Sequence, residues 1–199
     1  EAEQPIATEE PEVEPEPEEP APEPEEPAPT EAAPEPEPEP EMMEPVTFIF
    51  GRGGDSVGLD PAIVTDGESF RVTGNCLEPL YQYELGTTTP VPALAESCEP
   101  NEDATEWTCA LRQGVKFHDG TDFNADAVVW NYERWRKTDH PQHFEAQVFE
   151  YYEYMWGGFD DASTITSVEA VDANTVKFTL NAPLAPFLAN LAMDMFAIS

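Results

Sequence analysis

Apolar residues spaced two apart mark the strands expected in this chain. They occur at Val46, Phe48 and Phe50, at Val115 and Phe117, and at Val176, Phe178 and Leu180. Side chains of a strand alternate between its two faces, so this spacing is typical of a half-buried strand. Val168 and Val171 precede an Asp172-Ala173-Asn174 turn, which predicts a hairpin from Ser167 to Asn181.

A second pattern, with the period of a helix, begins after Asn124. The apolar face comprises Ala125, Val128, Val129, Tyr132 and Trp135. Asn124 is a favourable N-cap, and Asp126 places a negative charge in the first turn, where the helix dipole stabilises it. A helix is therefore predicted from residue 125 to about 137. Residues 185–193 form a shorter apolar helix candidate, whereas 140–162 show no regular pattern.

Composition divides the chain into two parts. Residues 1–45 contain 18 Glu and 14 of the 22 Pro, and no Lys or Arg. Like charges repel, proline removes backbone donors, and few apolar residues are available for a core. This segment is therefore expected to be a disordered, extended acidic stalk. Residues 46–199 are rich in aromatic residues and long enough to form one core.

The charge of the chain argues against two classes of partner. There are 42 acidic and 8 basic residues, for a net charge of -34. Such a chain repels nucleic acid and anionic lipid surfaces. No run of 18 apolar residues occurs, so no transmembrane helix is expected. The absence of an initial Met and of a signal peptide is the pattern expected of a processed or cut N-terminus.

The stretch from Leu111 to Trp130, LRQGVKFHDGTDFNADAVVW, resembles the signature of the family 5 solute-binding proteins of ABC importers. This family includes peptide-, dipeptide- and nickel-binding proteins, and its pattern is roughly LR-x-G-V-x-F-H-D-G-x-x-x-x-A-x-D-V. Ala125-Asp126-Ala127-Val128 departs from the usual A-x-D-V at the helix start. Leu59-Asp60-Pro61 resembles the LDP that follows the first strand in the family, and residues 91–97 resemble its P-x-LA-E-S.

The resemblance implies an α/β (α+β) fold, the two-lobed architecture of periplasmic binding proteins in the class with an extra subdomain. Members are several times longer than residues 46–199. This part is therefore expected to be the N-terminal part of the solute-binding domain, an incomplete first lobe with the small subdomain. The segment ESFRVTGNCLEPLYQY is similar to the family's first helix, which Pro79 would end. Its expected buried positions are Phe70, Val72, Leu77 and Leu80.

The three cysteines have different expected roles. Cys98 and Cys109 face each other if the segment between them is a hairpin that turns at Asp103-Ala104. Large aromatic residues usually occupy these two positions in the family, and Cys at both favours a disulfide, which requires an extracytoplasmic compartment. Two buried thiols are the alternative. Cys76 is expected to be a small buried apolar residue, and the absence of CxxC argues against zinc.

No motif predicts an enzyme, a cofactor or a bound metal. GxSxG and HExxH are absent. Asp160 and Asp161 are adjacent, whereas a catalytic pair needs opposed carboxylates, so both are expected to be solvated. His140 and His143 could offer imidazoles to a metal, but no third ligand is evident and a loop is favoured. His118 is expected to cap a strand end. The glycines at 51–54 are expected to form a flexible turn rather than a phosphate cradle.

Two groups of residues are expected near a ligand because of the resemblance. In peptide-binding members, the backbone shortly after the LDP pairs with the extended peptide as an added strand. This correspondence assigns ligand-binding roles to Thr65, Asp66, Gly67, Glu68 and Ser69, for which an ordinary connecting loop is the alternative. Phe144 matches an aromatic residue that reaches the cleft in related proteins. The aromatic residues between 144 and 159 could stack on a ligand, but a core role is favoured.

The function implied by the resemblance is that of the substrate-binding component of an ABC transporter. It would capture peptides outside the cytoplasm by closing two lobes and deliver them to a membrane permease. The resemblance further implies a monomer and a lipid anchor on a Cys upstream of the stalk. Oligosaccharide, nickel or opine-type ligands are alternatives, as is a sensor or adhesion module built on the same fold. Residues that clamp ligand termini usually lie in the lobe missing from this chain.

Overall fold

The computed structural model describes residues 47–144 and 148–199. The stalk expected over residues 1–45 and the position of Val46 lie outside the described residues. Residues Ile49–Ser199 form one compact unit, which contains every helix and strand of the described chain. Its mixture of helices and antiparallel sheet agrees with the expected fold class.

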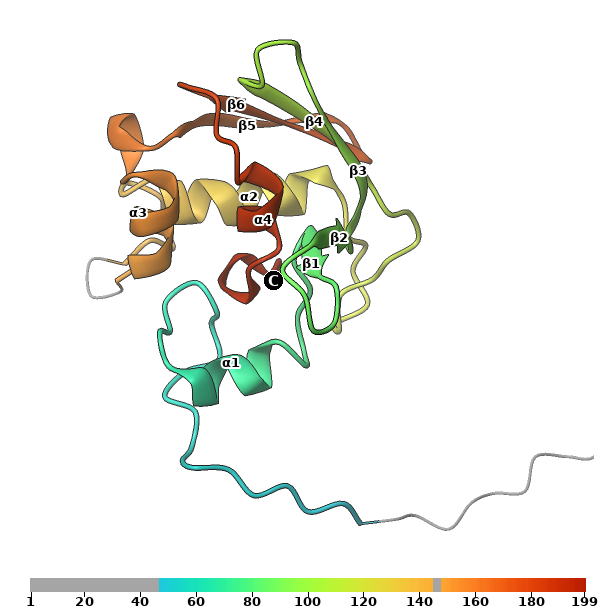
Figure 1. Cartoon of the computed structure of the whole chain (residues 1–199), viewed down its shortest axis with the longest axis vertical. Coiled ribbons are helices and arrows are strands. Elements are labelled where there is room, and N and C mark those ends of the chain that lie inside the picture. Colours follow the sequence, from blue (N-terminus) through green and yellow to red (C-terminus); the bar gives the residue numbers. More distant parts are fainter. Residues whose placement is uncertain (1–46, 145–147) are drawn as a thin grey trace, which may run out of the picture. The chain divides into compact units, whose positions relative to one another are not determined.

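A four-stranded antiparallel sheet lies at one end of this unit (Figure 1). Its strands, in the spatial order β3-β4-β6-β5, are β3 (Ala95–Pro100), β4 (Glu106–Leu111), β6 (Thr175–Leu180) and β5 (Ile165–Asp172). Both predicted hairpins are confirmed. In the first, Cys98 pairs with Cys109, and in the second, Asn174 N–H donates to the Asp172 carboxylate across 2.8 Å at the turn. A separate small hairpin joins β1 (Tyr81–Tyr83) and β2 (Pro90–Pro92).

Helix α2 (Ala125–Arg136) packs against β5 and β6. Asn124 is its N-cap, and the Asn124 side-chain oxygen accepts a hydrogen bond from Ala127 N–H at 3.0 Å. The predicted apolar face is buried at Val128, Tyr132 and Trp135. The ring of Tyr132 lies edge-on to Phe178 of β6, with centroids 4.9 Å apart. The cap and the helical pattern read from the sequence are therefore confirmed.

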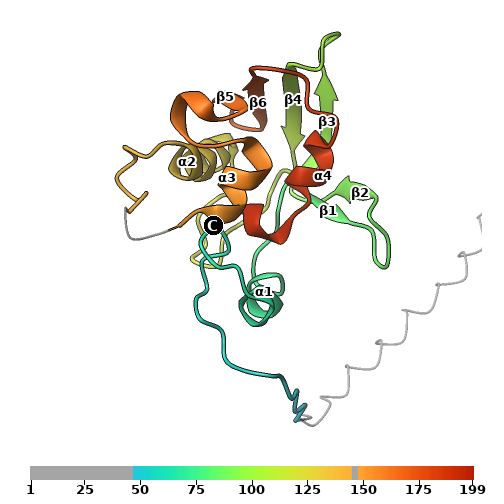
Figure 2. The ribbon, with the colours of Figure 1, turned by 60° about the vertical axis from the view of Figure 1, so that its left-hand side comes forward.

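Shorter helices complete the core, and α3 lies beside α2 (Figure 2). They are α3 (Glu150–Trp156), η1 (Asp160–Ala162), α4 (Phe187–Leu191) and η2 (Asp194–Phe196). Trp156 meets Phe187 and Phe196, with ring centroids 5.8 Å apart in each pair. α4 confirms the helix expected over 185–193, at a shorter length. Helix α3 was not predicted from the sequence, although Tyr152 and Trp156 have helical spacing and Gly157 ends the helix at φ +81°.

Two of the predicted strands are absent from the described part of the chain. Residues 47–50 form no strand, and Phe48 is 84% exposed, because no strand of the described residues pairs with them. Near residue 116, one isolated bridge between Lys116 and Asp122 replaces the strand. The chain reverses at Gly120, where φ is +89°, too soon for a ladder to form. His118 is therefore exposed in a turn and caps no strand.

Helix α1 (Gly67–Thr73) ends earlier than predicted. Gly74 follows it, and Gly74 N–H donates to Phe70 O at 2.9 Å, so the chain leaves the helix well before Pro79. Only Leu80 of the four expected positions is fully buried; the other three are half-buried. Cys76 lies in the turn after the helix and is exposed, which corrects the expectation that it is buried.

Cys98 and Cys109 are joined by a disulfide across β3 and β4, with Cα atoms 4.0 Å apart. Both residues are buried on the inner face of the sheet. The bridge links positions 11 apart in sequence. Its main effect is to limit the conformations of the unfolded chain.

Reduction of this disulfide is expected to lower the free energy of unfolding by about 2–3 kcal/mol, because a short closed loop is released in the unfolded state. Chemical denaturation of the full-length protein with and without reductant measures this. Mass spectrometry should place a gain of two hydrogens on the peptides that contain Cys98 and Cys109. Cys76→Ser is the control and should change neither result. Two free thiols at these positions in protein purified without reductant would contradict the prediction.

Candidate functional site

The candidate site begins at the turn formed by the LDP sequence. The Asp60 carboxylate accepts a hydrogen bond from Ala62 N–H at 3.1 Å, and Asp60 O accepts one from Ile63 N–H at 3.3 Å. An aspartate that bonds the backbone two residues on favours a tight turn. Ala62 and Val64 are buried, whereas Thr65 is exposed. This turn therefore fixes where the chain leaves the core.

Arg134 of α2 holds the same turn from inside the molecule. Its guanidinium forms an ion pair with Asp60 and donates from Nε to Gln142 O at 3.1 Å. It also lies 5.2 Å from the ring centroid of Phe149. The side chain is only 7% exposed, and a buried charge is tolerated when it is paired and hydrogen-bonded. Arg134 was not predicted from the sequence; the available signal was its position next to Trp135, which lies on the predicted apolar face of the helix.

Thr65 presents a backbone with free hydrogen-bonding groups. Within the described residues, Thr65 N–H and C=O form no hydrogen bond. The next residue, Asp66, has an extended backbone with φ -100° and ψ 145°. Gly67 is exposed and Glu68 is half-buried. An extended segment with unpaired peptide groups offers the donor and acceptor that an added strand requires.

Asp66 and Ser69 have structural roles of their own. Asp66 is the N-cap of α1, and its Oδ1 accepts a hydrogen bond from Ser69 N–H at 2.8 Å. Ser69 is buried, and its Oγ accepts hydrogen bonds from Val57 N–H at 3.0 Å and Gly58 N–H at 3.4 Å. Ser69, by its hydroxyl and then by its N–H, lowers the pKa of the Asp66 carboxyl. Contact of these side chains with a ligand stays a prediction.

The loop that carries Phe144 is tied to α2 nearby. Phe144 is 54% exposed, and residues 145–147 lie outside the described residues. His143 Nδ1 lies 2.8 Å from Arg134 O, and the His143 ring stacks on Phe149 with centroids 4.3 Å apart. The structure thus brings the LDP turn and the Phe144 loop to the same arginine. A ligand contact by Phe144 stays a prediction.

The aromatic residues near Phe144 belong mainly to the core. Phe149, Tyr152 and Trp156 are buried, whereas Tyr154 is exposed. The Tyr152 hydroxyl lies 2.9 Å from Ser163 Oγ, and burial raises the pKa of Tyr152 well above its ordinary value. The favoured core interpretation of this cluster is therefore confirmed for its buried members.

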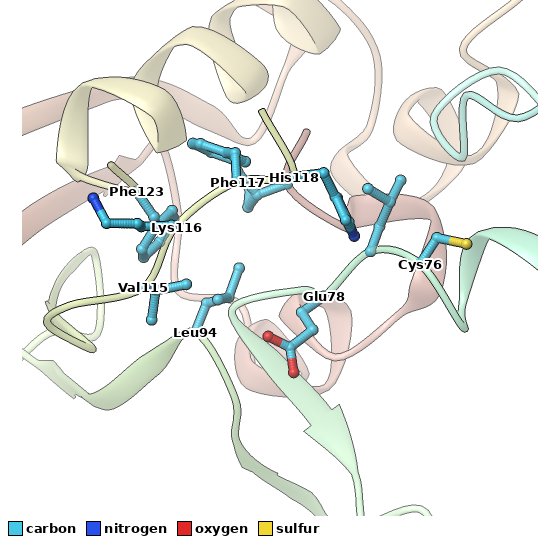
Figure 3. A pocket seen from close by; sticks show the side chains of 10 residues that line it. Cys76, Glu78, Leu94, Val115, Lys116, Phe117, His118 and Phe123 are labelled. Atoms are coloured by element: carbon cyan, nitrogen blue, oxygen red, sulfur yellow. The ribbon is translucent and has the colours of Figure 1, made fainter. Parts of the chain in front are cut away.

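Three hollows lie away from the predicted ligand residues. Figure 3 shows one of about 80 Å³, in which the Cys76 sulfur points away from an apolar wall of Leu94, Val115 and Phe123. A more open hollow of about 460 Å³ adjoins it and is lined by His118 and Trp130 among others. A third, of about 230 Å³, lies beside Phe70, Tyr83 and Met193. None of the three is lined by residues 65–69 or by Phe144.

Within residues 47–144 and 148–199, no group of three or more His, Cys, Asp or Glu side chains could hold a metal. His140 Nδ1 instead accepts a hydrogen bond from Gln142 N–H at 3.2 Å. Asp160 is half-buried and accepts from Thr138 Oγ1 at 2.5 Å, which corrects the expectation that it is simply solvated. Asp161 is exposed. The same part of the chain contains no helix long and apolar enough to cross a bilayer.

Comparison with known proteins gives a consistent set of relatives. Residues 89–199 match the model of the bacterial extracellular solute-binding proteins, family 5 Middle. The chain is 37% identical to the dipeptide-binding protein of Escherichia coli over 163 residues, which cover 76% of this chain and 29% of that protein. It is 36% identical to heme-binding protein A of Haemophilus influenzae, covering 76% and 28%.

Solved structures of similar fold include proteins of the same kind. The periplasmic binding protein DppA of Helicobacter pylori, in complex with the peptide STSA, is 39% identical. It superposes with a TM-score of 0.64 and covers 73% of this chain and 29% of its own. The chain thus spans less than a third of the length of the relatives that it matches.

The Asp66 carboxyl is expected to titrate below its ordinary pKa of 3.8, since Ser69 stabilises its charged form. Because the folded pKa is lowered, the resulting stability is present at neutral pH and is lost as the pH falls through the folded pKa. An NMR titration of the Asp66 carboxyl carbon measures the midpoint. Ser69→Ala should move it up towards 3.8, whereas the control Ser167→Ala should leave it unchanged. A midpoint above 3.8 in the unmutated protein would refute the assignment.

Proposed function

Because the chain belongs to family 5 of the bacterial extracellular solute-binding proteins, we propose that the full-length protein captures short peptides outside the cytoplasm. It then delivers them to the membrane permease of an ABC importer. Members of the family bind solutes for transport and do not convert them. The dipeptide-binding relative and the peptide complex among the solved structures favour a peptide as the solute.

The single observation that carries this proposal is the free backbone of Thr65. It stands directly before the extended Asp66 and after the Asp60 turn, and its peptide groups form no hydrogen bond within the described residues. A peptide lying alongside would gain backbone hydrogen bonds that do not depend on its side chains. A transporter of varied short peptides needs this kind of recognition.

The proposed mechanism requires a second lobe in the full-length protein. Ligand capture between the lobes and hinge closure would remove water from the peptide, and its hydrogen bonds would strengthen in the drier site. Residues that clamp the ends of the peptide are assigned to that second lobe. The part of the fold seen in this chain would supply one wall of the cleft, with Phe144 as an aromatic contact.

The N-terminal segment fits a tether in this proposal. Residues 1–45 carry 18 Glu and 14 Pro, and such a composition favours an extended chain over a packed core. We assign to it the role of a flexible stalk between the binding domain and a lipid anchor at the outer face of the cell membrane. The binding domain would act as a monomer and meet the permease while tethered.

Heme is a second candidate solute. Heme-binding protein A is almost as similar to this chain as the dipeptide-binding protein, at 36% against 37% identity. A heme ligand would use the apolar and aromatic part of the cleft rather than the free backbone of Thr65.

Isothermal titration calorimetry of the full-length protein should distinguish a peptide from heme as the solute. We expect saturable binding of the dipeptide Ala-Phe or of the tetrapeptide Ser-Thr-Ser-Ala, and no saturable binding of heme, maltotriose or Ni²⁺. Mass spectrometry of ligands that co-purify with the protein gives an independent reading and should recover peptides. Recovery of heme or oligosaccharide without peptides would overturn the peptide assignment.

Thr65→Pro is expected to weaken binding of the best peptide in that titration by about tenfold to a hundredfold. The substitution removes the Thr65 N–H and leaves a peptide carbonyl without its partner. Thr65→Ala keeps the backbone and should change the affinity by less than about threefold. Thr88→Pro is the matched control, because Thr88 also lies in an exposed loop but outside the proposed site. Equal affinity in Thr65→Pro and in the unmutated protein would contradict strand-like pairing at this position.

A further inference from the structure

Among the described residues, Arg134 forms polar contacts with both of the segments that the proposed site needs. One segment is the Asp60 turn with the chain up to residue 66, and the other is the loop 138–149, of which residues 145–147 are not described. Within the described residues, no direct hydrogen bond or ion pair joins residues 55–66 to this loop. Both segments instead bond to Arg134.

On one side, the Asp60 carboxylate is held at both oxygens. Oδ1 accepts from Ala62 N–H at 3.1 Å, and Oδ2 pairs with Arg134 Nη2. The orientation of the carboxylate therefore determines the direction of the turn that leads to Thr65. Loss of the Arg134 partner would leave Oδ2 without a cation and would allow the turn to rotate.

On the other side, Arg134 makes contacts through its side chain and its backbone. Nε donates to Gln142 O at 3.1 Å, and Arg134 O meets His143 Nδ1 at 2.8 Å. Phe149 packs against both the guanidinium and the His143 ring, at 5.2 and 4.3 Å. These contacts fix the loop directly before Phe144.

Arg136 provides a natural comparison on the same helix. Arg134 and Arg136 are 6% and 5% exposed, and each has a carboxylate partner. The partner of Arg136 is Glu133, three positions earlier in α2, at 2.7 Å. Arg136 thus satisfies its charge within its own helix, whereas Arg134 satisfies its charge by joining separate segments. Both arginines are equally buried, so burial alone does not explain why Arg134 pairs with a distant segment and Arg136 with its own helix.

We propose that Arg134 is a positioning residue for ligand binding. It couples the Asp60 turn to the Gln142–Phe144 loop, so that the Thr65 backbone and the Phe144 ring keep one relative arrangement. The purpose of this coupling rests on the proposed function, but the coupling itself does not. Arg134 acts through its neighbours, because its buried guanidinium is occupied by Asp60 and Gln142.

Hydrogen exchange of the full-length protein tests the coupling without any ligand. Asp60→Asn keeps an oxygen that accepts from Ala62 N–H but removes the charge that pairs with Arg134. We expect exchange of the His143 amide, which donates to His140 O in the other segment, to become about tenfold faster. Exchange of the Val176 and Phe178 amides in β6 reports global stability, and the acceleration at His143 should exceed theirs.

Arg134→Lys is the second variant, since it keeps a positive charge and is less disruptive than a neutral residue, but loses the Nε donor. It should speed exchange at both Ala62 and His143 and weaken Ala-Phe binding by about tenfold. Arg136→Lys is the matched control and should alter the affinity by less than about twofold. The double variant Asp60→Asn/Arg134→Lys should bind Ala-Phe with no lower affinity than the weaker-binding single variant, because both substitutions break the same Asp60–Arg134 interaction.

Two results would overturn the proposal. One is an unchanged His143 exchange rate in Asp60→Asn, which would show that the two segments are not coupled through Arg134. The other is an equal loss of affinity in Arg134→Lys and Arg136→Lys, which would indicate a general effect of altering a buried arginine. Failure of the unmutated protein to bind Ala-Phe would instead count against the proposed function, and the exchange arm would still decide the coupling.

Discussion

The burial of α2 on two of its sides is the constraint on which the other elements depend. One side packs Tyr132 and Trp135 into the core against the sheet. The adjacent side buries Arg134, whose charge is tolerable only because Asp60 and the Gln142 carbonyl meet it. The sheet therefore sets the position of α2, and α2 in turn sets the positions of the two segments proposed to meet a ligand. If Arg134 instead lay on a solvent-exposed side of α2, the Asp60 turn would lose this buried partner.

The signature stretch serves this scaffold rather than the candidate site. Leu111 is buried at the end of β4. The next residue, Arg112, donates its N–H to Leu94 O at 2.9 Å and so joins the end of β4 to the residue before β3. Val115 and Phe117 are half-buried around a small apolar hollow (Figure 3). The residues that identify the family therefore hold this part of the fold together, whereas recognition is assigned to the backbone of a short loop. Backbone recognition leaves little trace in residue type, so the most recognisable segment need not be the binding segment.

Local patterns succeeded where neighbouring residues along the chain decide the structure. The register of the first hairpin followed from the turn between Cys98 and Cys109, and the start of α2 followed from Asn124. The local patterns gave wrong predictions where a residue or strand distant in sequence determines the structure. Residues 47–50 have strand-like spacing but no strand beside them among the described residues, and α1 ends at Thr73 rather than near Pro79. A strand is stable only with a hydrogen-bonded neighbour, which periodicity cannot supply.

The sequence by itself determined the family, both hairpins, the capped helix and the segment in which a ligand contact is expected. It did so because caps, turns and alternation act over a few residues. Only the tertiary structure decided that Arg134 pairs with Asp60, 74 positions away, that Ser69 is buried and bonded to Val57, and that the Thr65 backbone forms no hydrogen bond within the described residues. Pairing of a buried charge and satisfaction of a peptide group depend on which distant segments meet. That is fixed by packing of the whole core and not by spacing along the chain.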